Sequence, residues 1–259
     1  AIMIRLLSIE LNKLRTYRAF WILSALYFAG LAGCLLTVEG IMNGLSNVKI
    51  FSFTSFPDVW HYFSYIGGFF HYVLAVIVII LICSEFDFKT VRQNIISGMS
   101  RGEWLAGKIL LMVFFALAST IVVFLCSMLM GLINSSSFEM GMMMDKMHFV
   151  LAYFIQTVGY LVFSILVGML IRNTGIAIGI FSIYTWIIEK VIVYYLPEEV
   201  GNFMPFEAFT STIKLPFLDA LPMGLAVQSG PDYLALGVSV FYIGLFTGLC
   251  YLFLTKRDL

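Results

Sequence analysis

Few side chains in this sequence of 259 residues are of types that carry out chemistry, and those few are scattered along it. The cysteines stand singly in apolar runs, without a C-x-x-C pair, so we expect small buried side chains rather than disulfides or a zinc site. His61 and His71 are ten residues apart, too far for both to bind one metal ion on a straight helix, and neither has Asp or Cys at ligand spacing. The sequence therefore predicts no metal centre and no enzyme active site. The cysteines are Cys34, Cys83, Cys126 and Cys250.

The segment from Gly102 to Lys108 reads G-x-x-x-x-G-K, which is how a phosphate-binding loop begins. Ile109 stands where such a loop has the Ser or Thr that holds Mg²⁺. A phosphate-binding loop also follows a strand, whereas this segment falls within an expected helix whose N–H groups are already hydrogen-bonded. We therefore expect the chain itself to bind no ATP and no other cofactor.

The composition is typical of a membrane protein. Apolar residues make up 61% of the chain and charged residues 12%, compared with about 45–50% and about 25% in soluble domains. Fifteen basic residues balance fifteen acidic ones, so no positive excess predicts a nucleic-acid partner. We expect residues 1–259 to form a single transmembrane domain in the lipid bilayer.

A membrane-spanning helix needs about 20 apolar residues. Five stretches of this length contain no charged residue, and a sixth must continue through Glu189 and Lys190 to become long enough. The sequence therefore predicts an all-α protein with six spans. The predicted spans are residues 19–38, 59–84, 109–137, 149–171, 173–196 and 233–255.

Basic residues are distributed unevenly between the two sides of this predicted membrane layout. Six spans place both termini on one side, which receives eleven of the fifteen Lys and Arg residues. Because Lys and Arg are retained in cytoplasmic segments, we expect both termini to be cytoplasmic. Residues 3–18 place apolar and polar side chains on different faces, a pattern typical of a helix that lies at the membrane surface.

Residues 86–100 are the most patterned of the predicted cytoplasmic loops. Phe88, Val91 and Ile95 have helical spacing and predict a narrow apolar face on a short helix. Lys89 and Arg92 fall on the other face of this helix. The pattern favours contact between the loop and a partner protein, although a helix that simply lies on the membrane has the same pattern.

A sharp break is expected after this short helix. Gly98 can adopt the left-handed backbone that ends a helix, and Ser100 and Glu103 have the spacing of a capping box that starts the next one. The loop is therefore predicted to be a helix, a break and a second helix, which together form a short rigid projection.

With these features the chain resembles the ABC-2 type permeases, the membrane subunits of ATP-binding-cassette exporters. It is most similar to the branch that includes bacteriocin and lantibiotic self-protection permeases. The resemblance covers the N-terminal amphipathic helix, the six-span layout, an acidic residue that closes the second span, the Gly-x-Ser-Arg break and a Lys that enters the third span. Many relatives have Gly-Thr soon after the acidic residue, where this chain has Lys89-Thr90. The matching residues are Glu85, Arg92, Asn94, Gly98, Ser100, Arg101 and Lys108.

The resemblance implies a separate cytoplasmic ABC ATPase subunit, which binds ATP and Mg²⁺ and onto which the N-terminal helix and the 86–100 loop dock as connecting and coupling helices. It also implies a homodimer, or a heterodimer with a related permease, in a bacterial cytoplasmic membrane. Glu85, Glu103 and Lys108 are expected to be structural or hinge residues. The residues expected to contact the ATPase subunit are Phe88, Lys89, Val91, Arg92, Ile95, Gly98, Ser100 and Arg101.

Ionisable groups at membrane depth are costly and are therefore candidates for function. Glu85, at the end of the second span, is expected to pair with Lys89, Arg92 or an N-terminal arginine. Glu189 and Lys190 are expected either to line an exit path or to extend towards the membrane surface.

The segment of residues 197–231 contains five prolines and is nevertheless rich in apolar residues. Short helices that dip back into the membrane fit this composition, and an ordinary extracellular loop is the alternative. The resemblance implies that this segment forms an outer gate before the last span.

The function expected from these observations is ATP-driven export of an amphipathic or hydrophobic substrate, such as a peptide antibiotic or a lipid. An ion-coupled secondary transporter would show internal repeats and carboxylates near the middle of its spans. A membrane-embedded enzyme would show clustered catalytic side chains. The sequence has neither feature, and both remain as alternatives that need no ATPase partner.

Overall fold

The computed structural model describes residues 2–15, 17–46, 54–135, 140–216 and 230–256, and every regular element in these ranges is a helix. This confirms the predicted all-α class for the described part of the chain. In chain order the elements are α1 (Ile2–Arg15), α2 (Arg18–Ser46), α3 (Val59–Gly68), α4 (His71–Asp87), α5 (Thr90–Ile96), α6 (Arg101–Asn134), α7 (Met140–Met144), α8 (His148–Ile171), α9 (Thr174–Ile183), the π-helical turn η1 (Tyr184–Ile188), α10 (Glu189–Tyr195), α11 (Glu198–Gly201), α12 (Pro205–Ser211) and α13 (Tyr233–Lys256).

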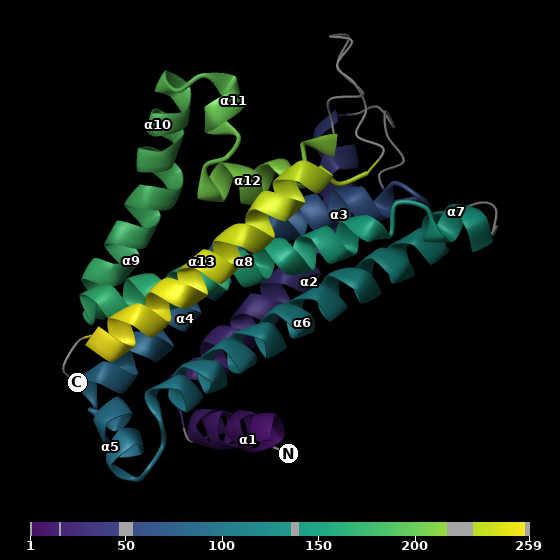
Figure 1. Cartoon of the computed structure of the whole chain (residues 1–259). Coiled ribbons are helices and arrows are strands. Elements are labelled where there is room, and N and C mark those ends of the chain that lie inside the picture. The colour runs from purple at the N-terminus through teal and green to yellow at the C-terminus, as the bar shows by residue number, and fades with distance from the viewer. Residues whose placement is uncertain (1, 16, 47–53, 136–139, 217–229, 257–259) are drawn as a thin grey trace.

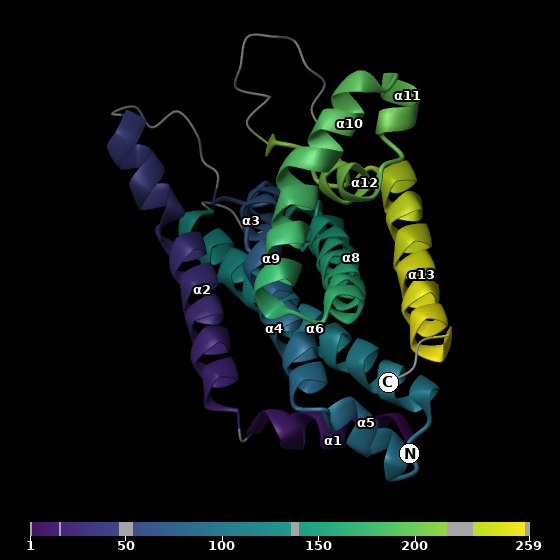
Figure 2. The same ribbon diagram turned by 90° about the vertical axis from the view of Figure 1, so that its left-hand side faces the viewer.

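The long helices form a bundle around α8, which packs against α3, α4, α6 and α13 (Figure 1). At one end of this bundle lie α5, the start of the chain and the C-terminal end of α13 (Figure 1). Figure 2 shows α1 lying crosswise beneath the other helices at this end. The elements α10, α11 and α12 lie at the opposite end. The bundle thus has one end that carries α1 and α5, and we call it the α5 end.

Five stretches of helix are long and apolar enough to cross a membrane, by length and composition. They belong to α2, α6, α8, the continuous run of α9, η1 and α10, and α13. A sixth span is formed if α3 and α4, which are bent by 41° relative to each other, count as one. The apolar windows of α2 and α13 are each only 17% buried within the chain, so most of their apolar surface is left for lipid or for another protein.

The predicted second span, residues 59–84, differs from the structure because it is broken into α3 and α4. The break at Phe69 and Phe70 directly follows Gly67 and Gly68, and small residues of this kind often accompany sharp helix kinks. Gly67 also permits close packing on α8, since an added Cβ would lie 2.9 Å from the ring of Tyr153.

Several other boundaries differ from those predicted. The first span extends to Ser46, and the third begins at Arg101 rather than at residue 109. The absence of charge marks only the apolar part of a helix, whereas α6 begins with a charged turn and is about 51 Å long at 1.5 Å per residue. Within the predicted 86–100 helix, α4 continues to Asp87 and α5 covers only Thr90–Ile96.

The fifth predicted span is one continuous helical run, but its middle is the π-helical turn η1. In the predicted segment 197–231, the structure shows α11 and α12, while residues 217–229 lie outside the described residues. Pro205 occupies the first turn of α12, where its missing N–H costs nothing. Phe206 and Phe209 are buried, and an added Cβ at Gly159 of α8 would lie 2.6 Å from the Phe209 ring. The apolar side chains of α12 are therefore explained by the packing of this helix onto α8 and α13.

Candidate functional site

The link between α4 and α6 has the predicted form of a helix, a break and a second helix. Lys89 has a left-handed backbone (φ 54°) just before α5, and Gly98 has one (φ 98°) just after it. The Ser100 hydroxyl accepts a hydrogen bond from the Glu103 N–H at 3.2 Å, and the Ser100 N–H donates to the Glu103 carboxylate at 2.8 Å. This reciprocal capping box starts α6 and leaves the backbone of the link well defined.

The predicted apolar face of α5 does not exist as one surface. Val91 is 2% exposed and belongs to the core, whereas Phe88 is 71% exposed. Phe88 lies before the left-handed turn at Lys89, so helical spacing counted from Phe88 does not continue into α5. Val91 therefore has no surface to offer a partner, and Ile95 is half-buried against the core. Phe88 and Ile96 are the large apolar side chains that remain exposed.

A cavity of about 250 Å³ lies where α4 turns into α5. Lys89, Arg92 and Arg172 contribute three positive charges to its lining, against one negative charge from Asp87. The Arg172 guanidinium lies 4.8 Å from the centre of the Phe86 ring, and Arg172, like Lys89, has a left-handed backbone. We call this feature the basic cavity. An acidic side chain could enter it and be stabilised by the surrounding charges.

At the α5 end of the bundle, a cluster of four charged side chains joins α1, α4 and α6. Lys108 of α6 donates hydrogen bonds to Glu10 of α1 and to Glu85 of α4. Lys13 donates to Glu10 at 2.8 Å and lies 3.8 Å from Glu85. The side chains of Lys108 and Glu10 are each 4% exposed. These residues, Glu10, Lys13, Glu85 and Lys108, are called the charge cluster below.

The charge cluster is electrically balanced, since two carboxylates face two ammonium groups. Burial raises the pKa of Glu10, but the charges and hydrogen bonds of Lys108 and Lys13 outweigh this effect and hold the pKa below its ordinary value. Trp104 adds a hydrogen bond from its indole N–H to Glu85 at 3.1 Å. Removing a fully buried member such as Lys108 leaves its carboxylate partners uncompensated, which costs about 3–5 kcal/mol.

Glu85 lies near the end of α4 and Lys108 near the start of α6, but the partners predicted for Glu85 are wrong. Glu85 pairs with Lys108 and Lys13, not with Lys89, Arg92 or an N-terminal arginine. The physical reason is that Lys108 lies buried against α1 and α4, within reach of both carboxylates, while α5 turns away from this point.

Glu10 was missed altogether, although the sequence contains a signal for it. Among the side chains of α1 that the structure describes, Leu6, Glu10 and Leu14 are buried, at intervals of four. A lone carboxylate within an apolar helical stripe predicts a buried partner of opposite charge, because burying it unpaired would be costly.

Arg101 was expected to contact a partner, but its guanidinium donates to the carbonyl oxygens of Leu254 and Thr255, each at 2.8 Å. Arg101 thus caps the C-terminal end of α13 and ties it to the start of α6. Of the predicted contact residues, Phe88, Lys89, Arg92, Gly98 and Ser100 are exposed.

At the other end of the bundle, Glu189 and Lys190 are held by α12. Glu189 is 1% exposed and accepts a hydrogen bond from the N–H of Glu207 at 2.7 Å. Lys190 forms an ion pair with the Glu207 carboxylate at 2.6 Å. The two residues, predicted to line an exit path or to extend to the membrane surface, therefore also fix α12 against α10.

The described ranges contain no group of three or more His, Cys, Asp or Glu side chains that could hold a metal ion. His61 stacks on the Phe149 ring at 4.1 Å, and His71 lies 2.9 Å from the Thr157 hydroxyl, so the two histidines have separate surroundings. Gly102 to Lys108 lies inside α6, as expected, and the Lys108 ammonium is occupied by the charge cluster.

Comparison with known proteins gives one result. The family model described as "Protein of unknown function (DUF2705)" matches residues 42–259. No curated protein shows a significant match to the chain.

Proposed function

The chain belongs to the DUF2705 family, and we propose that it is the membrane-spanning permease subunit of an ATP-driven exporter of the ABC-2 type. The observation that carries the proposal is the construction of the α5 end. There, α5 and the exposed Phe88, Lys89 and Arg92 project from the bundle, and buried contacts connect them to the long helices. ATP and Mg²⁺ belong to a separate ATPase subunit, and this chain contributes no catalytic residue.

A projection can transmit movement only if it is rigidly attached. Val91 anchors α5 in the core, and the capping box of Ser100 and Glu103 fixes the start of α6. A force on α5 is therefore passed to α4 and α6 rather than absorbed by the link. Rigid-body movement of packed helices of this kind is a common way to switch between conformations.

The N-terminal helix is attached to the same two long helices by the charge cluster. Glu10 connects α1 to Lys108 of α6, and Lys108 also connects to Glu85 of α4. In the proposed function, α1 is the connecting helix and α5 the coupling helix, and both move together with the long helices that they contact.

The exposed part of the α5 end has the chemistry of a docking surface. Phe88 and Ile96 are large apolar side chains that can enter a groove on a partner. The basic cavity beside them can accept an acidic side chain of that partner through Lys89, Arg92 and Arg172. The sequence layout puts eleven of the fifteen basic residues on the same side of the membrane as the 86–100 loop, and the preference of Lys and Arg for the cytoplasm supports a cytoplasmic α5 end.

The proposed mechanism is a tilting of the long helices that exchanges inward and outward openings of a path for an amphipathic or hydrophobic substrate. The permease works as a homodimer or as a heterodimer with a related chain, in a bacterial cytoplasmic membrane. The segment around α12 serves as the outer gate, with Glu189 and Lys190 at its hinge.

The experiment that tests this function is a measurement of substrate-stimulated ATP hydrolysis and transport by the reconstituted complex. Replacing Arg92 by Glu should lower coupled ATP hydrolysis by about tenfold or more, because it places a like charge opposite an acidic partner. Lys256→Glu is a matched control, since it makes the same charge change at an exposed residue that lies outside α1 and α5. Equal activity of both variants, or transport by the chain without any ATPase, would contradict the proposal.

A further inference from the structure

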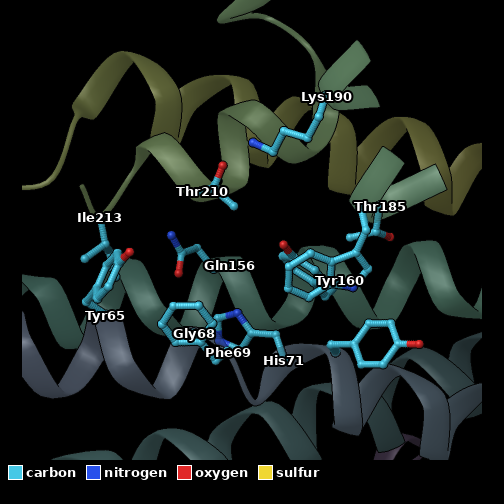
Figure 3. Close-up of a pocket in the computed structure, with 12 residues that line it drawn as sticks. Tyr65, Gly68, Phe69, His71, Gln156, Tyr160, Thr185, Lys190, Thr210 and Ile213 are labelled. Atoms are coloured by element: carbon cyan, nitrogen blue, oxygen red, sulfur yellow. The ribbon is translucent and has the colours of Figure 1, made fainter. Parts of the chain in front are cut away.

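A partly enclosed cavity lies where a helix break and a π-helical turn meet a short helix. The break between α3 and α4, the turn η1 and α12 surround it, and α8 forms its floor (Figure 3). Its volume is about 180 Å³. An engineered protein cavity of about 150 Å³ holds benzene, so this one has room for an aromatic ring with a short chain. Irregular backbone at membrane depth is tolerated where it lines a cavity, and π-helical turns are frequent at functional sites.

Aromatic rings form most of the wall of this cavity, contributed by Tyr65, Phe69, Tyr72, Tyr160 and Trp186. Phe69 is 59% exposed and Trp186 is 58% exposed. The cavity therefore opens between the α3–α4 break and η1, and its inner part is formed by the buried side chains of α4 and α8.

Two polar groups in the inner part are hydrogen-bond acceptors. The Gln156 amide N–H donates to the Phe209 carbonyl, which leaves the side-chain oxygen as an acceptor. The Thr157 hydroxyl donates to the Tyr153 carbonyl at 2.7 Å, so in its 2.9 Å contact with His71 the imidazole Nε2–H must be the donor. His71 is 1% exposed, and burial disfavours the charged form of an imidazole, so Nδ1 is left as an acceptor. Neither acceptor has a partner among the described residues.

The hydroxyl groups of the cavity add further acceptors. Thr185 and Thr210 donate their protons to the carbonyl oxygens of Phe181 and Phe206, at 2.7 Å and 2.9 Å, so only their oxygen lone pairs face a ligand. The Tyr160 hydroxyl makes no hydrogen bond to any described residue, although the residue is only 8% exposed. In Figure 3, Gln156 and Tyr160 project from α8 into the space below Thr210 and Lys190.

The charged side chain in the lining does not exclude a positive group. Lys190 lies at the rim, and its ammonium is paired with the Glu207 carboxylate at 2.6 Å. This ion pair neutralises the charge of Lys190, so the polar part of the lining acts mainly through its hydrogen-bond acceptors.

We propose that this cavity binds a small amphiphile that carries a protonated amine on a short apolar body. The apolar body lies among the aromatic rings, and the three N–H groups of the ammonium donate hydrogen bonds to the Gln156 side-chain oxygen, to Nδ1 of His71 and to the Thr185 hydroxyl oxygen. Aromatic faces add to the attraction for such a cation. Binding requires no ATPase subunit, so this assignment stands or fails separately from the proposed function.

The test is calorimetric titration of the full chain, reconstituted in nanodiscs of neutral phospholipid, with three probes. The probes are 2-phenylethylamine, 2-phenylethanol and 3-phenylpropionate, which share a phenyl ring on a two-carbon linker and differ in the polar head. We expect the amine to bind most tightly and the carboxylate at least about tenfold more weakly, because a carboxylate cannot donate hydrogen bonds to the acceptors of the cavity and its charge is costly to bury. Equal affinities, or tighter binding of the carboxylate, would overturn the assignment, and empty nanodiscs give the background.

Substitutions at Gly68 and Thr185 test whether the amine occupies this cavity. An added Cβ at Gly68 meets only His71, at 4.0 Å, so the larger side chain of Gly68→Leu grows into the cavity and should abolish amine binding. Gly237→Leu is the matched control, because an added Cβ there meets nothing within 4 Å and the residue lies outside the cavity lining.

Thr185→Val keeps the shape of the side chain and removes one hydrogen-bond acceptor, so it should lower the affinity for the amine by roughly fivefold. This second variant keeps the test valid if Gly68→Leu fails to fold. Thermal unfolding of each variant shows whether that variant is folded. Undiminished amine affinity in folded Gly68→Leu, or in Thr185→Val, would overturn the assignment.

Discussion

Glu10 and Lys108 are 98 residues apart in the chain and form a buried ion pair between α1 and α6. Each side chain is only 4% exposed, and Lys108 shares its ammonium with Glu85 of α4. An amphipathic helix held only by lipid and by its apolar stripe could move independently of the bundle. The ion pair removes this freedom, because separating α1 from the bundle would leave charges buried without partners.

Replacing Lys108 by Met should therefore destabilise the protein strongly. The substitution leaves the carboxylates of Glu10 and Glu85 near each other without their shared cation, at a cost of about 3–5 kcal/mol. Thermal unfolding of the purified protein in detergent measures this effect. Lys13→Met is the control, because the Lys13 side chain is 29% exposed and the loss of a partly exposed pair should cost about 1 kcal/mol or less. Similar melting temperatures for the two variants would show that Lys108 is not the centre of the cluster.

The charge cluster also predicts how stability depends on pH. The pKa of Glu10 is held below its ordinary value of 4.5 in the folded protein, so the unfolded chain binds a proton more readily than the folded one. The contribution of Glu10 is fully present above pH 4.5 and is lost as the pH falls through the lower folded pKa. Glu10→Gln should be less stable than the wild type at pH 7, and the difference should shrink at pH 4 and below. Melting temperatures over this range would refute the assignment if the difference grew with acidity.

Gly98 should be sensitive to substitution for conformational reasons alone. Its φ of 98° is unfavourable for any residue with a Cβ, although an added Cβ would meet no atom within 4 Å. Gly98→Ala should therefore cost about 1 kcal/mol or more and should loosen the link between α5 and α6. Hydrogen exchange of residues 90–104 should increase in this variant, while Gly33→Ala, also with open space around an added Cβ, should leave exchange there unchanged. Unchanged exchange in both variants would mean that the turn does not depend on glycine.

The sequence was sufficient for the features that depend on local chemistry. Long apolar runs predicted helices that are long and apolar enough to cross a membrane, and Gly98, Ser100 and Glu103 predicted the break and the capping box that the structure shows. Features that depend on packing were not predictable in this way. The π-helical turn η1 has no distinct sequence signal, and the burial of Val91 depends on a left-handed turn at Lys89, a residue with no local preference for that backbone.

The charge cluster lies between these two cases. Glu85 and Lys108 were recognised as boundary charges, but their pairing depends on where the crossing helices place them. Glu10 could have been identified from its position between Leu6 and Leu14 on one helical stripe. The cavity between the α3–α4 break and η1 could not, because its lining is gathered from four stretches that lie far apart in the chain, residues 65–72, 156–160, 185–190 and 210–213.

Photocrosslinking from position 88 tests the central claim most directly. A photoreactive phenylalanine analogue in place of Phe88, which is 71% exposed, should capture a soluble ATP-hydrolysing subunit in intact cells. The same analogue at Ile121, which is 55% exposed in the middle of α6, should capture lipid or another membrane chain instead. Mass spectrometry of the crosslinked products identifies the partner in each case. Capture of an ATPase subunit from position 88 and not from position 121 is the predicted result, and crosslinks from position 88 only to lipid or to extracytoplasmic proteins would contradict the account.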